Sequence, residues 1–326
     1  MRPSTEFFPR FTARRIGVTA YQTLLATGQQ GKVLAVVSGC IYLVGPAGHL
    51  IWLVREFLPL HTRAIQLAGE WPGLLRDVPF QIRAGELVFH TGVVVDAAKA
   101  EVWQPAAAGS DGWLPLAEIC EKSRLLYSQL IKIPRTGFGG FIEPMLALTS
   151  QVSGVQRPQF SDHVLRVAWP AVQAVGRASA CQNLDAILAR ASDLVGLGNG
   201  LTPSGDDFLG GLFFGLLALN RLFPAQIELD PEPVQKMLAR ITDRTNLISG
   251  AILKDLAAGQ GPEPMHDLVH LLVTPASPAS ILTAARALAS IGHSTGWDLL
   301  TGLLAGLLWA WSATGQGLPE TTCREK

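Results

Sequence analysis

The sequence has little charge for its length, and its basic residues form no cluster. Only 16% of its 326 residues are charged, and 26 Lys and Arg balance 26 Asp and Glu, so the formal net charge is zero. A nucleic-acid-binding protein usually carries a basic patch that contacts phosphates, so this composition argues against a nucleic-acid partner. An apolar content of 48% argues equally against a disordered chain. We therefore expect a compact globular protein with an ample core.

The sequence also lacks the cysteine spacing of a zinc site or a disulfide framework. Its four cysteines, Cys40, Cys120, Cys181 and Cys323, are scattered and form no Cys-x-x-Cys pair. We expect ordinary reduced, mostly buried thiols. Because no His, Asp or Glu stands at the helical spacing of a metal ligand beside His293, we expect neither a metal nor another cofactor.

Long apolar segments and targeting signals are missing as well. Residues 1–30 contain several arginines but no uninterrupted apolar run of the kind that a secretory signal needs. The most apolar segment, Leu299 to Trp311, is too short to span a bilayer. We therefore expect a cytoplasmic protein without membrane contact.

Several catalytic and nucleotide-binding motifs are absent. The sequence has no Gly-Lys-Ser/Thr of a P-loop and no nucleophile elbow. The glycines at 196, 198 and 200 have the wrong spacing for a dinucleotide fingerprint, and they follow a helical pattern instead of a strand. Rossmann, Walker and serine-hydrolase interpretations are therefore set aside.

The first half of the chain predicts β-structure. From about Lys32 to Trp103 the sequence is rich in β-branched and aromatic residues, and VLAVVSGCIYLVG and HLIWLV flank the turn Gly45-Pro46-Ala47-Gly48 as in a hairpin. The segment GELVFHTGVVVD predicts a further strand or strand pair, whereas PLHTRAIQL is ambiguous. Apolar residues at spacings of three and four then predict a helix over 116–131.

Beyond residue 160 the sequence is rich in Ala and Leu and predicts helices. The expected helices cover 161–176, 182–195, 205–222, 232–257, 265–273, 279–291 and 296–312. We therefore expect an α+β fold, with a mainly β N-terminal domain over 1–150 and an all-α C-terminal domain over 151–326.

The most informative stretch is GLGNGLTPSGDD at residues 196–207, followed by the apolar run FLGGLFFGLLAL. Thr202 before Pro203 suits an N-cap and a first helical residue, and Ser204 three residues before Asp207 suits a capping box. The helix that follows is apolar all round, which predicts a position in the core of a large domain.

A second copy of this unit lies near the C-terminus. Placing Ser204 over Thr295 pairs SGDDFLGGLFFGLLAL with TGWDLLTGLLAGLLWA, and three glycines and one aspartate coincide. Both copies carry Gly-x-x-x-Gly, which lets two helices cross with their backbones close together. We expect two pseudo-symmetric buried Gly-rich helices whose N-termini open onto one shared pocket.

The start of a helix offers unpaired amides and the positive end of the macrodipole, so these segments suit a phosphate or carboxylate. The expected ligand-binding residues are Gly198, Gly200, Thr202, Ser204, Gly205, Asp207, Thr245, Ser249, Ser294, Thr295 and Asp298. Asp206 and His293 are the expected proton-handling catalytic residues. The alternative is that the aspartates merely cap their helices and that Thr245 and Ser249 bond back to their own helix.

The segments GLGNGLTPSGDDFLGG, TNLIS (245–249) and GHSTGWDLLTGL resemble the AllH family in sequence and spacing. The resemblance implies a role beside FdrA-like and AllG-like proteins in oxamate carbamoyltransferase. That enzyme interconverts oxalurate and phosphate with oxamate and carbamoyl phosphate in anaerobic allantoin breakdown, a branch of purine catabolism. It thus implies a transferase component with a small anionic metabolite as substrate.

Three functions stay open from the sequence. The first is a carbamoyltransferase component that works mainly by positioning and by stabilising negative charge. The second is a noncatalytic protein that binds a small anion in the same pocket. The third is a structural subunit of a larger complex, with the chemistry in a partner.

Overall fold

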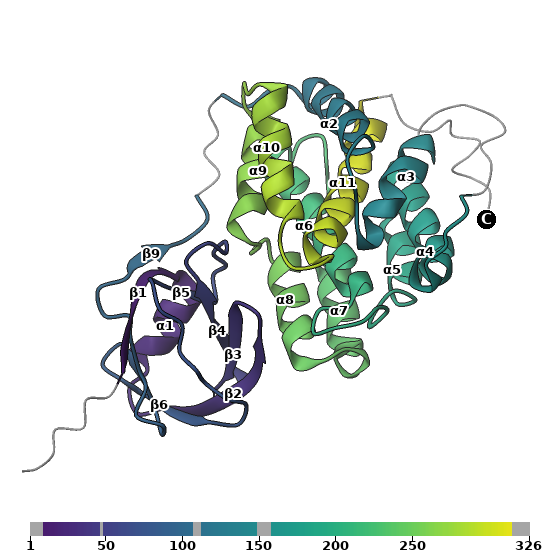
Figure 1. Ribbon diagram of the computed structural model, residues 1–326. Coiled ribbons are helices and arrows are strands. Elements are labelled where there is room, and N and C mark those ends of the chain that lie inside the picture. Colours follow the sequence, from purple (N-terminus) through teal and green to yellow (C-terminus); the bar gives the residue numbers. More distant parts are fainter. Residues whose placement is uncertain (1–8, 46–47, 107–111, 149–157, 315–326) are drawn as a thin grey trace, which may run out of the picture. The chain divides into compact units, whose positions relative to one another are not determined.

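The computed structural model of the chain describes residues 9–45, 48–106, 112–148 and 158–314. The chain divides into two compact units, residues 1–106 and 107–326. The first consists mainly of strands and the second of helices (Figure 1), so the fold is α+β. The division falls earlier than residue 150, because the segment from Trp113 to Met145 packs into the core of the helical unit.

The first unit is a closed sheet with one short helix. Its strands, in chain order, are β1 (Arg10–Gly17), β2 (Gln30–Val37), β3 (Cys40–Val44), β4 (Leu50–Arg55), β5 (Ala64–Leu67), β6 (Pro79–Arg83), β7 (Glu86–Phe89), β8 (Val94–Asp96) and β9 (Glu101–Trp103). Helix α1 (Val18–Leu25) follows β1 directly. The strand order is β5-β4-β3-β2-β6-β7-β8-β1-β9, and β1 also pairs with β5, which closes eight strands into a barrel.

Alternation of burial along several of these strands shows that one face of the sheet packs inward. In β3, for example, Ile41 and Leu43 are fully buried while their neighbours are half-exposed, as expected when one face of a sheet packs inward. Apolar residues of this kind from the strands and from α1 form one core in the barrel, including Ile16, Leu24 and Val95. The predicted antiparallel pairing across the turn at 45–48 is confirmed for β3 and β4.

The second unit contains ten of the chain's α-helices within the described residues. They are α2 (Leu116–Leu130), α3 (Ile142–Leu148), α4 (His163–Ala180), α5 (Leu184–Ala191), α6 (Ser204–Leu222), α7 (Glu232–Arg240), α8 (Leu247–Ala257), α9 (Glu263–Val273), α10 (Pro278–Ala289) and α11 (Thr295–Ala313). Two short 3-10 helices, η2 (Gly137–Phe141) and η3 (Thr242–Arg244), complete it. None of the described helices is both long and apolar enough to cross a membrane.

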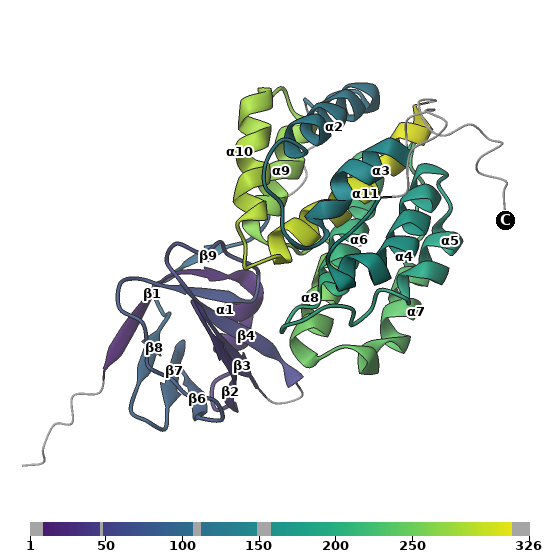
Figure 2. The same ribbon diagram turned by 45° about the vertical axis from the view of Figure 1, so that its right-hand side comes forward.

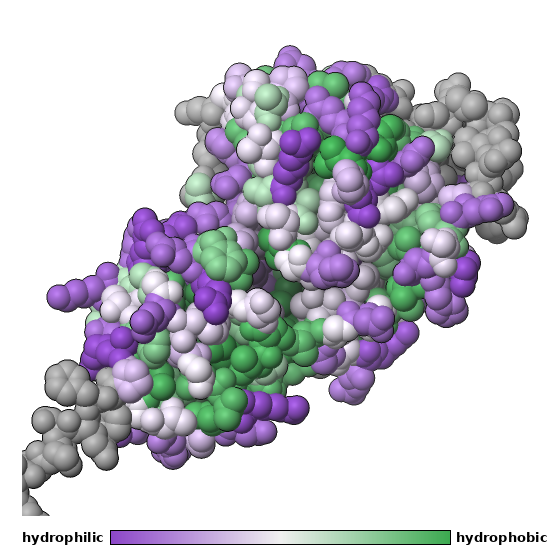
Figure 3. Space-filling model, viewed as in Figure 1, coloured by the Kyte–Doolittle hydropathy of each residue, from purple (hydrophilic) through white to green (hydrophobic). Residues whose placement is uncertain are grey.

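Helices α6 and α11 lie at the centre of this unit. Figures 1 and 2 show them flanked by α3 and α4 on one side and by α9 and α10 on the other. Every residue from Ser204 to Leu217 and from Gly296 to Trp311 is buried, as the apolar sequences predict. Hydrophilic side chains are spread over the face of the outer helices that Figure 3 shows, with apolar patches between them.

The single helix predicted over 232–257 is wrong, because the chain breaks between α7 and α8. Asn246 has an extended backbone, and its side chain accepts hydrogen bonds from the amides of Ile248 and Ser249, so it caps α8. Thr245 therefore lies before the helix that contains Ser249, although the apolar spacing runs on through the break.

The cysteines follow the prediction only in part. Cys40 and Cys120 are free thiols, and burial raises the pKa of each well above its ordinary value. Cys181 is disulfide-bonded, which corrects the expectation of a reduced thiol for this residue. Cys323 lies outside the described residues.

The crossing of α6 and α11 depends on glycine. A Cβ added at Gly211 would lie 2.1 Å from the carbonyl oxygen of Leu299, and one at Gly302 would lie 1.9 Å from that of Phe208. Such distances mean that the two backbones touch, and a methyl group at either position would force the helices apart. One turn further on, a Cβ at Gly306 would lie 2.8 Å from the carbonyl oxygen of Leu212.

We predict that Gly302→Ala lowers the free energy of unfolding by about 3 kcal/mol or more, since an added methyl group overpacks a rigid contact. Urea unfolding followed by circular dichroism measures the effect. Gly250→Ala in α8 is the control, because a Cβ there makes only an ordinary contact, 3.5 Å from Thr245 Cγ2. That substitution should leave stability unchanged or raise it by up to about 1 kcal/mol. Equal stability changes in the two variants would contradict the close crossing.

Candidate functional site

The N-terminal ends of α6 and α11 are built alike. Each begins with a hydroxyl residue, Ser204 or Thr295, and the next residue in each is a glycine. A Cβ at Gly205 would lie 1.9 Å from the carbonyl oxygen of Leu194, and one at Gly296 would lie 2.0 Å from that of Leu288. In both places a carbonyl oxygen from the preceding segment therefore lies against the first turn of the helix, and only a residue without a Cβ leaves room for that oxygen.

The Gly-rich lead-in to α6 takes a backbone path that favours glycine. Gly196, Gly198 and Gly200 all have positive φ angles, of 74°, 123° and 96°. A Cβ at Gly198 would lie 2.7 Å from the amide nitrogen of Ser204, so its absence keeps the first amide of the helix uncrowded. Pro203, not Thr202, stands in the N-cap position of α6, and no side chain caps the helix there.

Asp206 points to the Gly-rich segment and to α8. Its Oδ1 accepts a hydrogen bond from the amide of Gly196 at 2.8 Å. Its Oδ2 accepts one from Ser249 Oγ at 2.7 Å and another from the Thr245 hydroxyl. The predicted residues Asp206, Thr245 and Ser249 are thus brought together, but both carboxylate oxygens are engaged in holding the loop to α8.

Asp207 and Asp298 occupy the space between the two helix starts. Both side chains are buried, with 2% and 0% exposure. The hydroxyls of Thr202 and of Thr295, from the other helix start, lie close enough to Asp207 to lower its pKa, and those of Ser294 and of Ser204, from the other helix start, act in the same way on Asp298. The hydroxyls of Thr202 and Thr295 are themselves 3.0 Å apart. We call these two aspartates and four hydroxyl residues the helix-start cluster.

Burial makes the two carboxyl groups of this cluster weaker acids than an exposed aspartate. It raises the pKa of Asp207 well above 3.8, and the nearby charge of Asp298 raises it further, while the nearby hydroxyls of Thr202 and Thr295 oppose the rise. Burial also raises the pKa of Asp298 from 3.8 to about 6, against the bond from the Phe138 amide. The Oδ2 atom of each is buried and has no hydrogen-bond partner among the described residues. Burial therefore favours the protonated form of both carboxyl groups.

A third segment, Thr136 with η2, also contacts the cluster. This contact was not predicted from the sequence. The amide of Phe138, in η2, donates to Asp298 Oδ1 at 2.6 Å, and the hydroxyl of Thr136 donates to the carbonyl of His293 at 2.8 Å. Gly137 has φ of 51°, and a Cβ there would lie 2.4 Å from Asp298 Oδ1. The Gly-rich turn at 137–140 was the available signal, but nothing in the sequence connects it to Asp298.

Several other predicted site residues lie at the solvent-exposed edge of the helix-start cluster. His293 and Gly200 are exposed, while Thr202, Ser294 and Thr295 are half-buried and form the outer part of the cluster. No hydrogen bond or ion pair joins His293 to Asp206 within the described residues. No group of three or more described His, Cys, Asp or Glu residues is placed to hold a metal ion.

The raised pKa of Asp298 predicts a pH effect on stability. The protonated form of the carboxyl group stabilises the fold fully below pH 3.8, and this contribution is lost as the pH rises through about 6. Asp298→Asn does not titrate, so between these values it should gain up to about 3 kcal/mol in free energy of unfolding relative to wild type. Urea unfolding at several pH values measures the difference.

Asp243→Asn, which changes an exposed aspartate of the same unit, is the control for this titration. A difference between Asp298→Asn and wild type that stays constant from acid to neutral pH would show that the pKa of Asp298 is not raised.

Comparison with known proteins yields one family match. A family model described as oxamate carbamoyltransferase subunit AllH matches residues 194–307, which is less than half of the chain. The matched segment begins at Leu194, whose carbonyl oxygen lies against Gly205, and ends just after Gly306 in the helix crossing. It includes both Asp207 and Asp298. Gly137 and Phe138 lie outside it. No solved structure matches the chain. Residues 194–307 are therefore similar in sequence to the AllH family.

Proposed function

We propose that this chain is a subunit of a carbamoyltransferase and that its helix-start cluster binds a small anionic metabolite. In this proposal α6 and α11 are two copies of one unit, related by an approximate two-fold axis, and their starts form a single site. The similarity of residues 194–307 to an oxamate carbamoyltransferase subunit family supports the reaction class. The substrates expected from the resemblance are oxalurate, oxamate, phosphate and carbamoyl phosphate.

The observation that carries the proposal is that the aspartate of each helix start interacts with a hydroxyl group of the other helix start. The hydroxyl of Thr295 in α11 lowers the pKa of Asp207 in α6, and the hydroxyl of Ser204 in α6 lowers the pKa of Asp298 in α11. The same reciprocal pattern occurs at the crossing, where each glycine meets the carbonyl of the other helix. These paired contacts support one composite site better than two independent caps.

The main objection to an anion site is that two aspartates stand in it. Burial weakens this objection, because it raises the pKa of Asp207 well above 3.8 and that of Asp298 to about 6. A carboxyl group that stays neutral near pH 7 donates a hydrogen bond where a carboxylate repels an anion. The hydroxyls and the helix-start amides add further donors.

This mixture of groups suits a carbamoyl compound. The ligand's NH₂ group needs an acceptor, which an ionised Asp298 supplies, and its carbonyl, carboxylate or phosphate oxygens need donors, which Asp207 and the hydroxyls supply. Donors aimed at those oxygens also stabilise negative charge that develops during transfer of the carbamoyl group.

The residues take different parts in this proposal. Because all its oxygens are bonded to the loop and α8, Asp206 acts as a positioning residue that fixes the Gly-rich segment. Asp207 is the group that holds a proton inside the cluster, and Asp298 is the group that accepts a hydrogen bond from the ligand. His293 is exposed beside them on the second helix start and is the candidate for exchanging protons with solvent.

The alternative is a noncatalytic or structural subunit. In that case the aspartates serve only the packing of α6 on α11, and the chemistry lies in partner subunits such as the FdrA-like and AllG-like proteins. The complete bonding of Asp206 is the observation that favours this alternative.

The test is a thermal unfolding series of the purified chain with phosphate, carbamoyl phosphate, oxamate and oxalurate. Binding at about a hundred times Kd stabilises the folded state by roughly 2.7 kcal/mol, so Tm should rise by several degrees. Ser204→Ala removes one donor of the cluster and should reduce the rise substantially.

Ser290→Ala is the matched control, because Ser290 is an exposed hydroxyl of the same unit that bonds only to its own helix at Ala287. Its response to each ligand should equal that of the wild type. If none of the four compounds raises the Tm of the wild type, the anion site does not exist in this chain alone, and the structural alternative is favoured.

A further inference from the structure

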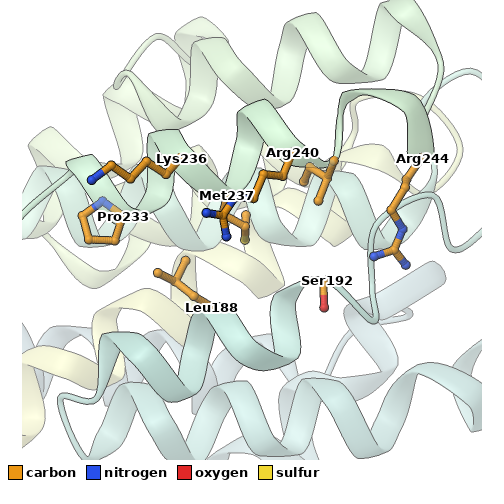
Figure 4. Close-up of a pocket in the computed structure, with 8 residues that line it drawn as sticks. Leu188, Ser192, Pro233, Lys236, Met237, Arg240 and Arg244 are labelled. Carbon is orange, nitrogen blue, oxygen red and sulfur yellow. The ribbon is translucent and has the colours of Figure 1, made fainter.

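A concave site lies between α5 and the segment formed by α7 and η3. It is a cavity of about 530 Å³, within the size range of small-molecule sites. Figure 4 shows Lys236, Met237, Arg240 and Arg244 on one side of it and Leu188 and Ser192 on the other. None of these residues belongs to the helix-start cluster.

One wall of the cavity is cationic. Lys236, Arg240 and Arg244 follow each other at intervals of four residues and all line the same space. Lys236 forms an ion pair with Glu232 at 2.8 Å. Arg240 and Arg244 form no ion pair with any acidic residue in the described part of the chain. The nearby Asp193 pairs with Arg190 at 3.7 Å. Two guanidinium groups are therefore free to bind an anion.

The remaining lining is partly apolar and partly polar. Leu188 and Met237 are half-buried and offer apolar surface from opposite walls, and Ser192 adds a hydroxyl. A small inorganic ion would leave most of the cavity and this apolar surface unused.

From this arrangement we propose that the cavity binds an organic phosphate, with its phosphate on Arg240 and Arg244 and its organic part between Leu188 and Met237. Two guanidinium groups and a nearby ammonium match the charge and the three free oxygens of a phosphate ester, whereas a carboxylate has one charge and two oxygens. Apolar walls hold an aromatic or aliphatic group by burying its surface.

This site adjoins the Gly-rich segment without being part of it. A Cβ at Gly196 would lie 2.4 Å from the carbonyl oxygen of Arg244, and the next residue, Thr245, donates to Asp206. A ligand on the Arg244 side chain thus binds directly beside the loop that Asp206 holds.

Isothermal titration calorimetry with phenyl phosphate tests the proposal, with inorganic phosphate and benzoate as comparison ligands. Phenyl phosphate should bind the wild type more tightly than either. Arg240→Gln and Arg244→Gln should each weaken its binding about tenfold, the loss expected for one charge-assisted contact. Leu188→Asn should weaken phenyl phosphate more than inorganic phosphate.

Arg286→Gln is the control, since it removes the same charge from an exposed position on α10. Ser204→Ala should leave phenyl phosphate binding unchanged, which separates this site from the helix-start cluster. The proposal is overturned if the wild type does not bind phenyl phosphate, if benzoate binds as tightly, or if Arg286→Gln weakens binding as much as Arg240→Gln.

Discussion

The direct contact between the backbones of α6 and α11 is the constraint on which the helical unit depends. Gly211 and Gly302 each face a carbonyl oxygen of the other helix at a distance that excludes a Cβ. Other helices of the unit pack around this crossing pair, and the aspartates at the two helix starts are buried with it. The crossing therefore decides which groups meet at those starts.

Bringing the two starts together creates a small polar cluster inside an apolar unit. Asp207 and Asp298 are both buried, each keeps one oxygen without a partner among the described residues, and burial raises the pKa of both. A buried charge of this kind disfavours folding unless it is neutralised or paired. Buried carboxyl groups that weaken the fold and have raised pKa values are typical of a functional site, which is why we propose this pair as the place of the chemistry.

Much of the helical unit could be predicted from the sequence, because α6 and α11 are apolar all round and start at marked Gly and Pro residues. The roles of neighbouring residues could not. Successive helical residues point about 100° apart, so Asp206 faces α8 while Asp207 faces α11, and only the packing determines which is which. The break before Asn246 was missed because the apolar spacing continues across it. Gly137 meets Asp298 through a contact between distant segments, and the pairing of β1 with β5 and β8 is equally distant.

The most direct test of the shared site is hydrogen–deuterium exchange of the whole chain with and without oxamate and phosphate at saturating concentration. If α6 and α11 present one composite site, the amides of 196–207 and of 292–298 will gain protection together. They will also lose it together in Ser204→Ala, although that substitution changes only the first segment. Protection confined to one of the two segments, or absent from both, would contradict the account.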